Sequence, residues 1–240
     1  MPLRTERRGR VAVLVLDDSE TRNALGAEMV EQILTTVGEC EADDGVGALV
    51  VTGAPPAFCS GADVRALRDM KGRDASDVRS IYDGFLRIRE SSLPTVAAVN
   101  GPAVGAGFNL ALCCDVRIAG ASARFDARFA RIGLHPGGGH VWMLERAVGP
   151  QAAAAMTLFG ERIDGARAAE LGLAWRCVPD DELLDHAIEL AAQAAELDRE
   201  LAAAVKATLS EAPWHADFEA AVQVELARQR RTFEAGGGPS

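Results

Sequence analysis

The chain has 240 residues, 48% of them hydrophobic and 25% charged, which is typical of a globular protein that folds around its own core. Its formal net charge of −10 argues against a nucleic-acid partner, because such partners require a basic surface. No uncharged apolar run approaches the ~20 residues of a membrane span. The five cysteines are irregularly spaced, fit no metal-ligand pattern, and indicate reduced thiols in a cytoplasm.

Strands and helices are predicted to alternate through the first half of the chain. We interpret VAVLVLD (11–17) as a first strand and not as a signal peptide, because aspartates cut the apolar run short. Apolar side chains then recur at i, i+3, i+4 and i+7 from Val30 to Val37, which indicates an amphipathic helix. Further strands are expected at 47–53, 95–100 and 115–120, with a helix at 75–89 and another after Gly107. This alternation predicts an α/β fold with a largely parallel sheet.

The second half of the chain is predicted to be mostly helical. Its alanine-rich segments carry apolar residues at helical spacing, at 151–159, 164–171, 181–197, 199–210 and 217–231. We expect an α/β core over residues 1–150 and a helical region over 151–232 that covers this core or contacts other subunits. A disordered tail is expected over 233–240. Trp142 and Trp175 are expected to be core residues.

Two loops of small residues follow predicted strands and precede predicted helices. They are PPAFCSGADVRAL (55–67) and NGPAVGAGFNLAL (100–112). Such junctions expose backbone N–H groups, here near Ala62 and Ala106, with little obstruction from side chains. If the junctions face each other, these groups form a site for a carbonyl oxygen that gains negative charge, where one donor is worth about 3 kcal/mol in a transition state. The alternative is that the glycines only allow tight turns.

Other catalytic motifs do not fit the sequence. The loop at 105–110 lacks the last glycine of the dinucleotide fingerprint, and no GxxxxGK[ST], HExxH or GxSxG sequence occurs. Ser60 has no obvious base in its own segment, so we do not expect it to be a nucleophile.

The order and spacing of four motifs resemble those of the enoyl-CoA hydratase/isomerase family, the crotonases. The motifs are FCSGAD (58–63), AVNGPAVGAGFNLALCCDVRIAG (98–120), GLHPGGG (133–139) and GARAAELGLAWRCVP (165–179). The resemblance begins at about Val11, includes ETRNAL (20–25), and runs to about residue 230. It implies a spiral of ββα units and a helical C-terminal region that forms a homotrimer, often as a dimer of trimers.

The same resemblance implies an acyl-CoA ligand, with no further cofactor and no metal. The N–H groups of Ala62 and Ala106 would hold the thioester carbonyl oxygen and stabilise an enolate. The segment from Ser60 to Val64 would line the adenine pocket, and Arg22 and Arg65 would either lie near the CoA phosphates or be solvated surface charges. The residues expected to bind the ligand are Arg22, Ala24, Ser60, Gly61, Asp63, Val64, Arg65 and Gly105.

The positions of the two glutamates that hydratases of this family use are occupied by other residues. The first corresponds to Asn109, two residues after the glycine-rich loop, and the second to Phe129. Neither side chain can titrate, and Phe129 cannot hold a water molecule. Because general acid–base catalysis contributes about 10²- to 10⁴-fold per group, we expect hydration to be weak or absent.

Four other titratable residues could take the place of the glutamates: Asp126, His135, His140 and Glu145. We favour Asp126, three residues before Phe129, and His135, next to the PGGG turn. Each of the four also has a structural interpretation as a surface charge, an ion-pair partner or a buried hydrogen-bonding group. Two functions therefore remain open. One is an enzyme of fatty-acid metabolism with weak hydration or another enolate chemistry, and the other is a non-catalytic acyl-CoA carrier.

Overall fold

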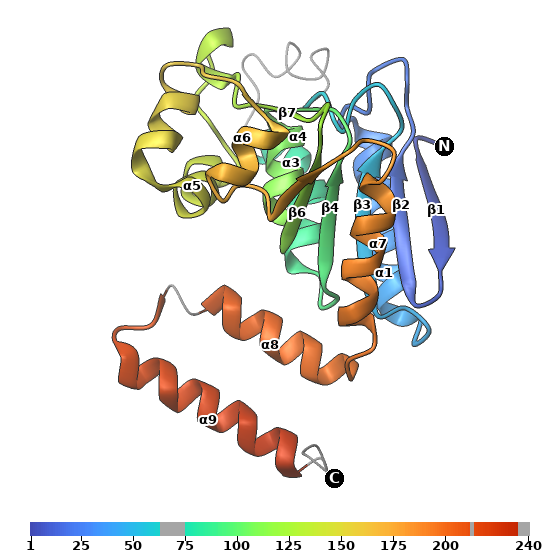
Figure 1. Cartoon of the computed structure of the whole chain (residues 1–240), viewed down its shortest axis with the longest axis vertical. Coiled ribbons are helices and arrows are strands. Elements are labelled where there is room, and N and C mark those ends of the chain that lie inside the picture. Colours follow the sequence, from blue (N-terminus) through green and yellow to red (C-terminus); the bar gives the residue numbers. More distant parts are fainter. Residues whose placement is uncertain (63–74, 212–213, 235–240) are drawn as a thin grey trace.

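The computed structural model describes residues 1–62, 75–211 and 214–234, which form two β-sheets and the helices that cover them (Figure 1). This arrangement confirms the predicted α/β fold. Within these ranges, no helix is both long enough and apolar enough to cross a membrane.

The larger sheet contains six strands in the order β1-β2-β3-β4-β6-β9. β1 is antiparallel to β2, and the other neighbours are parallel. The strands are β1 (Leu3–Arg8), β2 (Val11–Leu16), β3 (Ala48–Gly53), β4 (Thr95–Val99), β6 (Val116–Gly120) and β9 (Arg176–Val178). β2 and β3 are buried along their whole length, as their unbroken apolar sequences predict. The sequence did not predict β1, because this edge strand is polar except for the buried Leu3.

The smaller sheet consists of β5 (Pro102–Val104), β7 (Arg124–Asp126) and β8 (Ile163–Asp164). β5 is parallel to β7, and β7 is antiparallel to β8. The chain passes from the larger sheet to the smaller one at Gly101, between the ends of β4 and β5. A Cβ atom on Gly101 would lie 2.8 Å from the Pro56 carbonyl oxygen. The loop after β3 therefore approaches the link between β4 and β5 so closely that only glycine fits there.

Three helices lie on one face of the larger sheet: α1 (Ala27–Ala42), α3 (Ala75–Glu90) and α4 (Ala106–Cys113) (Figure 1). Every residue of α4 is buried, which explains why its sequence is apolar almost all round. Phe85, Phe108 and Phe125 fill the core between these helices and the sheets. Cys113 and Cys114 are free thiols packed in the same core, as predicted.

The opposite face of the larger sheet is covered by α7 (Leu183–Ala195) (Figure 1). Leu183, Ala187, Ala191 and Ala195 form a buried stripe at i, i+4 spacing along this helix. The stripe packs on side chains from four strands, namely Val11, Val13, Val15, Ala48, Val50, Val96, Ala98 and Ile118. In the described part of the chain, α7 is the helix that contributes buried residues to this second core.

The predicted boundary at residue 150 is followed by strands as well as helices. That residue lies inside α5 (His140–Thr157), which follows the 3-10 turn η1 (Phe129–Ile132) and bends at Gly149. α6 (Gly165–Glu170) and α7 come next, and β8 and β9 of the two sheets also lie beyond residue 150. Thus the segment up to α7 completes the core. α8 (Arg199–Glu211) and α9 (Phe218–Glu234) extend away from it (Figure 1). Of the predicted tail, residues 233 and 234 still belong to α9, and residues 235–240 lie outside the described ranges.

α8 and α9 pack against each other and contact the core at separate points. Lys206 of α8 is buried; its Nζ donates to the Leu93 carbonyl oxygen (2.8 Å) and pairs with the Asp115 carboxylate (2.9 Å). The Trp214 ring, just before α9, stacks on the Trp142 ring of α5 with 5.6 Å between centroids.

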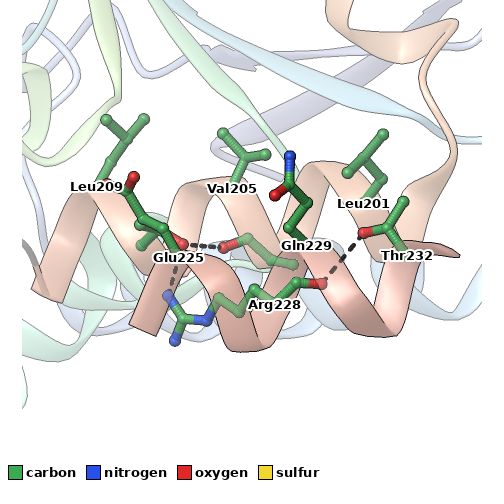
Figure 2. A pocket seen from close by; sticks show the side chains of 9 residues that line it. Leu201, Val205, Leu209, Glu225, Arg228, Gln229 and Thr232 are labelled. Carbon is green, nitrogen blue, oxygen red and sulfur yellow. Dashed lines mark hydrogen bonds between the residues drawn. The ribbon is translucent and has the colours of Figure 1, made fainter. Parts of the chain in front are cut away.

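Between α8 and α9 lies a pocket (Figure 2) lined by Leu201, Ala204, Val205, Thr208, Leu209, Glu225, Arg228, Gln229 and Thr232.

The prediction that Trp175 is a core residue was wrong. Its side chain is 69% exposed, although its neighbour Ala174 is buried. The backbone N–H of Trp175 donates to the Arg117 carbonyl oxygen (2.7 Å) at the entry to β9, so the chain is held at this point by its backbone. Trp142, in contrast, is partly buried and packs against the main core.

Candidate active site

The two glycine-containing junctions that the sequence singled out lie side by side. The Cys59 N–H donates to the Pro102 carbonyl oxygen (3.1 Å), and the Val104 N–H donates to the Cys59 carbonyl oxygen (3.0 Å). Cys59 and Ala103 therefore form a parallel bridge between the loop after β3 and strand β5. Because both junctions are fixed by one short ladder, the ends that follow it, at Ala62 and Ala106, lie on the same side of the molecule.

Glycine at two positions allows this close approach. A Cβ atom on Gly61 (φ +109°) would lie 2.7 Å from the Val104 carbonyl oxygen and 3.7 Å from the Ala106 backbone nitrogen. A Cβ atom on Gly107 would lie 2.7 Å from the Cys59 Cβ atom. The glycines therefore do more than permit tight turns, because they bring the two backbones into direct contact.

Ala106 is the first residue of α4, and the preceding Gly105 provides no side-chain cap. The Ala106 N–H is thus one of the free donors at a helix N-terminus. Ala62 forms a parallel bridge with Leu25, in which the Leu25 N–H donates to the Gly61 carbonyl oxygen (2.8 Å). Neither the Ala62 nor the Ala106 N–H has an acceptor among the described residues. Two backbone donors at adjacent junctions can bind an oxygen atom that carries negative charge.

The first junction is held in place by a buried asparagine that the sequence analysis did not single out. Asn23 is fully buried with φ +62°, and its Nδ2 donates to the carbonyl oxygens of Ala54 (2.9 Å) and Ala57 (2.8 Å). Its Oδ1 accepts from the Asp18 N–H (2.9 Å). The sequence signal was the asparagine inside ETRNAL, because asparagine tolerates a left-handed backbone better than most residues.

The structure describes five of the eight predicted ligand-binding residues, and their surroundings differ. Ser60 is tied to the preceding turn: its N–H donates to the Arg22 carbonyl oxygen (3.0 Å) and its Oγ to the Thr21 carbonyl oxygen (2.7 Å). The Arg22 side chain is exposed, Ala24 and Gly61 are buried, and Gly105 is partly buried at the start of α4. The remaining three, Asp63, Val64 and Arg65, lie outside the described residues.

Asn109 and Phe129, which the sequence analysis assigns to the positions of the family glutamates, both contact His140. Asn109 is buried one turn into α4, and its Nδ2 donates to the Gly137 carbonyl oxygen (3.0 Å). Its Oδ1 lies 2.7 Å from His140 Nδ1. The Phe129 ring contacts the His140 ring edge-on, with 5.0 Å between centroids. The structure thus groups two predicted positions with a histidine that the sequence analysis considered but did not favour.

His140 is the first residue of α5 and only 1% exposed. Burial lowers the pKa of its imidazole to about 4, so the ring is neutral at physiological pH. Its Nε2 atom is buried and has no hydrogen-bond partner in the described part of the protein. No sequence pattern could have indicated this orientation, because it depends on the three-dimensional path of the PGGG turn between η1 and α5.

Neither favoured substitute for the glutamates has contacts of this kind. The buried Asp126 carboxylate is bound by Arg131, by Arg162 (3.1 Å) and by Arg128 (3.7 Å), so its oxygens serve as ion-pair acceptors. His135 is exposed, and its Nδ1 lies 2.7 Å from the carbonyl oxygen of the adjacent Pro136. Glu145 is exposed on α5. Their assignment as proton carriers stays a prediction without support from these contacts.

Cys59 lies in the ladder between the junctions but is not a nucleophile. Burial raises the pKa of its thiol to about 12, so the sulfur is protonated at neutral pH. A protonated, buried thiol is unreactive. In the described part of the chain, no group of three or more histidine, cysteine or acidic side chains is placed to hold a metal ion.

The fold is that of a crotonase. The chain belongs to the enoyl-CoA hydratase/isomerase family, whose sequence profile matches residues 6–235. It is 48% identical over 222 residues to a Mycobacterium tuberculosis protein named probable enoyl-CoA hydratase EchA14, covering 91% of this chain and 85% of the relative.

Two solved structures illustrate the range of the family. A Thermobifida fusca protein in complex with CoA is 31% identical, with a TM-score of 0.86 and coverage of 98% of this chain and 94% of that one. A monofunctional enoyl-CoA isomerase from M. smegmatis is 32% identical, with a TM-score of 0.79 and coverage of 92% and 98%, respectively.

Proposed function

We propose that this protein binds an acyl-CoA thioester with its carbonyl oxygen between the backbone N–H groups of Ala62 and Ala106. The observation that carries the proposal is the direct contact of the two junctions at Gly61 and Ala106. A thioester carbonyl gains negative charge when its C2 proton leaves, and each backbone donor then contributes about 3 kcal/mol to stabilising the enolate. Membership of the enoyl-CoA hydratase/isomerase family supports the ligand class.

We further propose that hydration of an enoyl-CoA is weak or absent. Hydration requires one group that takes a proton from water and one that delivers a proton to the acyl chain. Asn109 can do neither, and Phe129 replaces a polar contact with an aromatic ring packed on His140. The function that fits best is therefore an enolate-forming enzyme of the isomerase type.

A second candidate is a non-catalytic carrier of fatty acyl thioesters. It is favoured by the same two residues, because a site without titratable groups at these positions can still hold a carbonyl oxygen. The two candidates share the predicted ligand and the predicted place in fatty-acid metabolism. They differ only in whether a proton moves after binding.

The experiment that tests the carbonyl site removes one donor without removing a side chain. Proline is tolerated at the first position of a helix and has no N–H, so Ala106→Pro deletes the Ala106 donor. Ala27→Pro is the matched control, because Ala27 is the first residue of α1 and lies outside the site. Infrared spectra of bound butyryl-CoA labelled with ¹³C at the carbonyl report on hydrogen bonding to that oxygen.

We expect wild type and Ala27→Pro to shift the carbonyl band to lower frequency on binding. Ala106→Pro is expected to lose much of this shift and to bind more weakly in calorimetry. An unshifted carbonyl band in the wild-type complex would contradict the proposed site. Crotonyl-CoA turnover at ordinary enzyme rates, followed by loss of the conjugated-thioester absorbance, would contradict the proposal of lost hydration.

The assignment of the glutamate positions is tested by restoring them. Asn109→Glu combined with Phe129→Glu is expected to raise the rate of crotonyl-CoA hydration by at least tenfold, since each acid–base group contributes about 10²- to 10⁴-fold when well placed. Asn109→Gln with Phe129→Gln is the matched control, with equal size and no titration. A folded Glu/Glu variant no faster than this control would show that the positions are misassigned.

We also propose that α8 and α9 take part in self-association, as a homotrimer or a dimer of trimers. Support comes from apolar side chains that these helices expose, including Leu209 (70% exposed), Val205 and Leu226. Light scattering after size exclusion is expected to give a trimer or hexamer mass, and Leu209→Glu is expected to lower it. A monomeric wild-type protein would refute this assembly.

A further inference from the structure

The polar contact of Asn109 determines the tautomer of His140. The Gly137 carbonyl oxygen can only accept a hydrogen bond, so the Asn109 group that faces it at 3.0 Å must be the Nδ2 amide. The Asn109 Oδ1 then faces His140 Nδ1 at 2.7 Å and can only accept. Nδ1 therefore carries the proton, and the lone pair of the neutral imidazole lies on Nε2.

This lone pair is buried without a partner among the described residues. Nε2 has no hydrogen bond, although the ring is only 1% exposed. A buried polar atom without a partner is costly, because it has lost its hydrogen bonds to water, and such atoms are rare in native proteins. The surroundings are aromatic: the Phe108 and Phe129 rings contact the imidazole at centroid distances of 5.3 Å and 5.0 Å.

The imidazole is connected to the carbonyl site through short contacts. A Cβ atom on Gly105 would lie 3.8 Å from Phe129 Cζ, so the ring that packs on His140 also packs beside the start of α4. Asn109 is in the same helix, and its N–H donates to the Gly105 carbonyl oxygen (3.0 Å). Asn109 therefore lies one helical turn from Ala106, and it connects the start of α4 to His140, whose ring the Phe129 ring also contacts.

We infer that His140 is the proton-transferring residue of this site, with Nε2 as the base that takes a proton from C2 of the bound acyl thioester. This inference rests on the proposed acyl-CoA site. In the step, the C2–H bond breaks and its proton moves to Nε2. The electron pair forms the enolate, whose charge on oxygen is stabilised by the Ala62 and Ala106 N–H groups. Return of the proton to C2 regenerates neutral His140 and the starting thioester. When the bound thioester is a 3-enoyl one, loss of its C2 proton gives a dienolate, and delivery of the proton to C4 regenerates neutral His140 and moves the double bond to C2–C3, which is a positional isomerisation.

The proton affinity of His140 suits this role. A pKa of about 4 gives a neutral imidazole the basicity of an ordinary glutamate, whose reference pKa is about 4.3. Unlike a carboxylate, the ring needs no counter-charge when it is deprotonated. In the described surroundings, the groups facing it are the Asn109 amide of α4, the Phe108 ring of α4 and the Phe129 ring of η1. On α3, the Tyr82 hydroxyl occupies the space beside Gly137, whose carbonyl oxygen accepts from Asn109.

The test measures exchange of the C2 protons of butyryl-CoA for deuterium in D₂O, after calorimetry has established that butyryl-CoA binds. His140→Asn keeps an amide donor for Asn109 Oδ1 and removes Nε2. We expect wild-type protein to exchange deuterium into C2 and His140→Asn to lose at least 100-fold in rate, in line with the about 10²- to 10⁴-fold effect of general bases. Binding of butyryl-CoA by this variant is expected to change by less than threefold.

A second variant separates catalysis from a purely structural role. Asn109→Asp places a carboxylate beside His140 Nδ1, and this charge raises the pKa of the imidazole. The pH below which the exchange rate falls is therefore expected to move upward. A wild-type protein that binds butyryl-CoA without exchange would overturn this inference and leave the binding proposal intact. Absence of binding would overturn both. Loss of exchange in His135→Asn with full exchange in His140→Asn would also overturn it.

Discussion

The buried neutral histidine makes a specific prediction about stability in acid. The pKa of His140 is about 4 in the folded protein and about 6.5 in an unfolded chain. Between these values the unfolded state binds a proton that the folded state does not, so lowering the pH favours unfolding. The contribution of the neutral His140 to the free energy of unfolding is complete above pH 6.5, and it is lost as the pH falls through about 4. It corresponds to about 2 kcal/mol between pH 7.5 and 5, and about 3 kcal/mol in total.

The assay is urea unfolding followed by circular dichroism, for wild type and His140→Asn, at several pH values from 7.5 to 4.5. Asparagine does not titrate, so the variant lacks the pH dependence that His140 gives to the free energy of unfolding. The pH dependence due to all other groups is the same in both proteins and cancels in the comparison. We expect the variant to be less stable at pH 7.5, because it leaves a small cavity. The difference from wild type is expected to shrink by about 2 kcal/mol at pH 5. Parallel pH profiles for the two proteins would refute the burial argument.

Two further predictions concern packing and charge. Gly107→Ala places a methyl group against the Cys59 backbone and is expected to cost about 1–3 kcal/mol, whereas Gly38→Ala in α1, with open space around it, is expected to stabilise the protein by about 0.5–1 kcal/mol. Equal effects of the two substitutions in urea unfolding would contradict the close contact of the junctions. Asp126→Asn leaves three arginines without their shared acceptor and is expected to cost about 1–3 kcal/mol, against less than about 1 kcal/mol for Glu170→Gln in an exposed ion pair. Thermal unfolding measures both, and a loss for Asp126→Asn no larger than that for Glu170→Gln would argue against a structural role of the cluster.

The sequence predicted those elements whose signal is local. The buried strands β2 and β3 appear as unbroken apolar runs, and α1 has the periodicity of a one-sided helix. The edge strand β1 has no such pattern, because its pairing with β2 depends on backbone hydrogen bonds and not on apolar side chains. The strands β8 and β9, which lie beyond the predicted boundary at residue 150, were not predicted for a similar reason. β9 pairs with β6, more than 50 residues earlier, and no local feature announces a pairing at that distance.

The candidate site was predictable only in part. The small residues of both junctions indicated the backbone donors, because glycine and alanine are required wherever two backbones come close. The choice among Asp126, His135 and His140 could not be made from sequence, since all three lie within 15 residues of one another, between the end of β7 and the start of α5. Only the fold shows that the Asp126 carboxylate is bound by arginines, that His135 is exposed, and that His140 contacts both Asn109 and Phe129.

The cover that α7 provides has a consequence for synthesis of the protein on the ribosome. The four strands that bury side chains under α7 are complete at Gly120, but α7 itself ends 75 residues later at Ala195. At elongation rates of about 5–20 residues per second, that delay is roughly 4 to 15 s. During it, a valine-rich sheet face of the nascent chain stays open to solvent. We therefore expect chaperone binding to be strongest over this interval of translation.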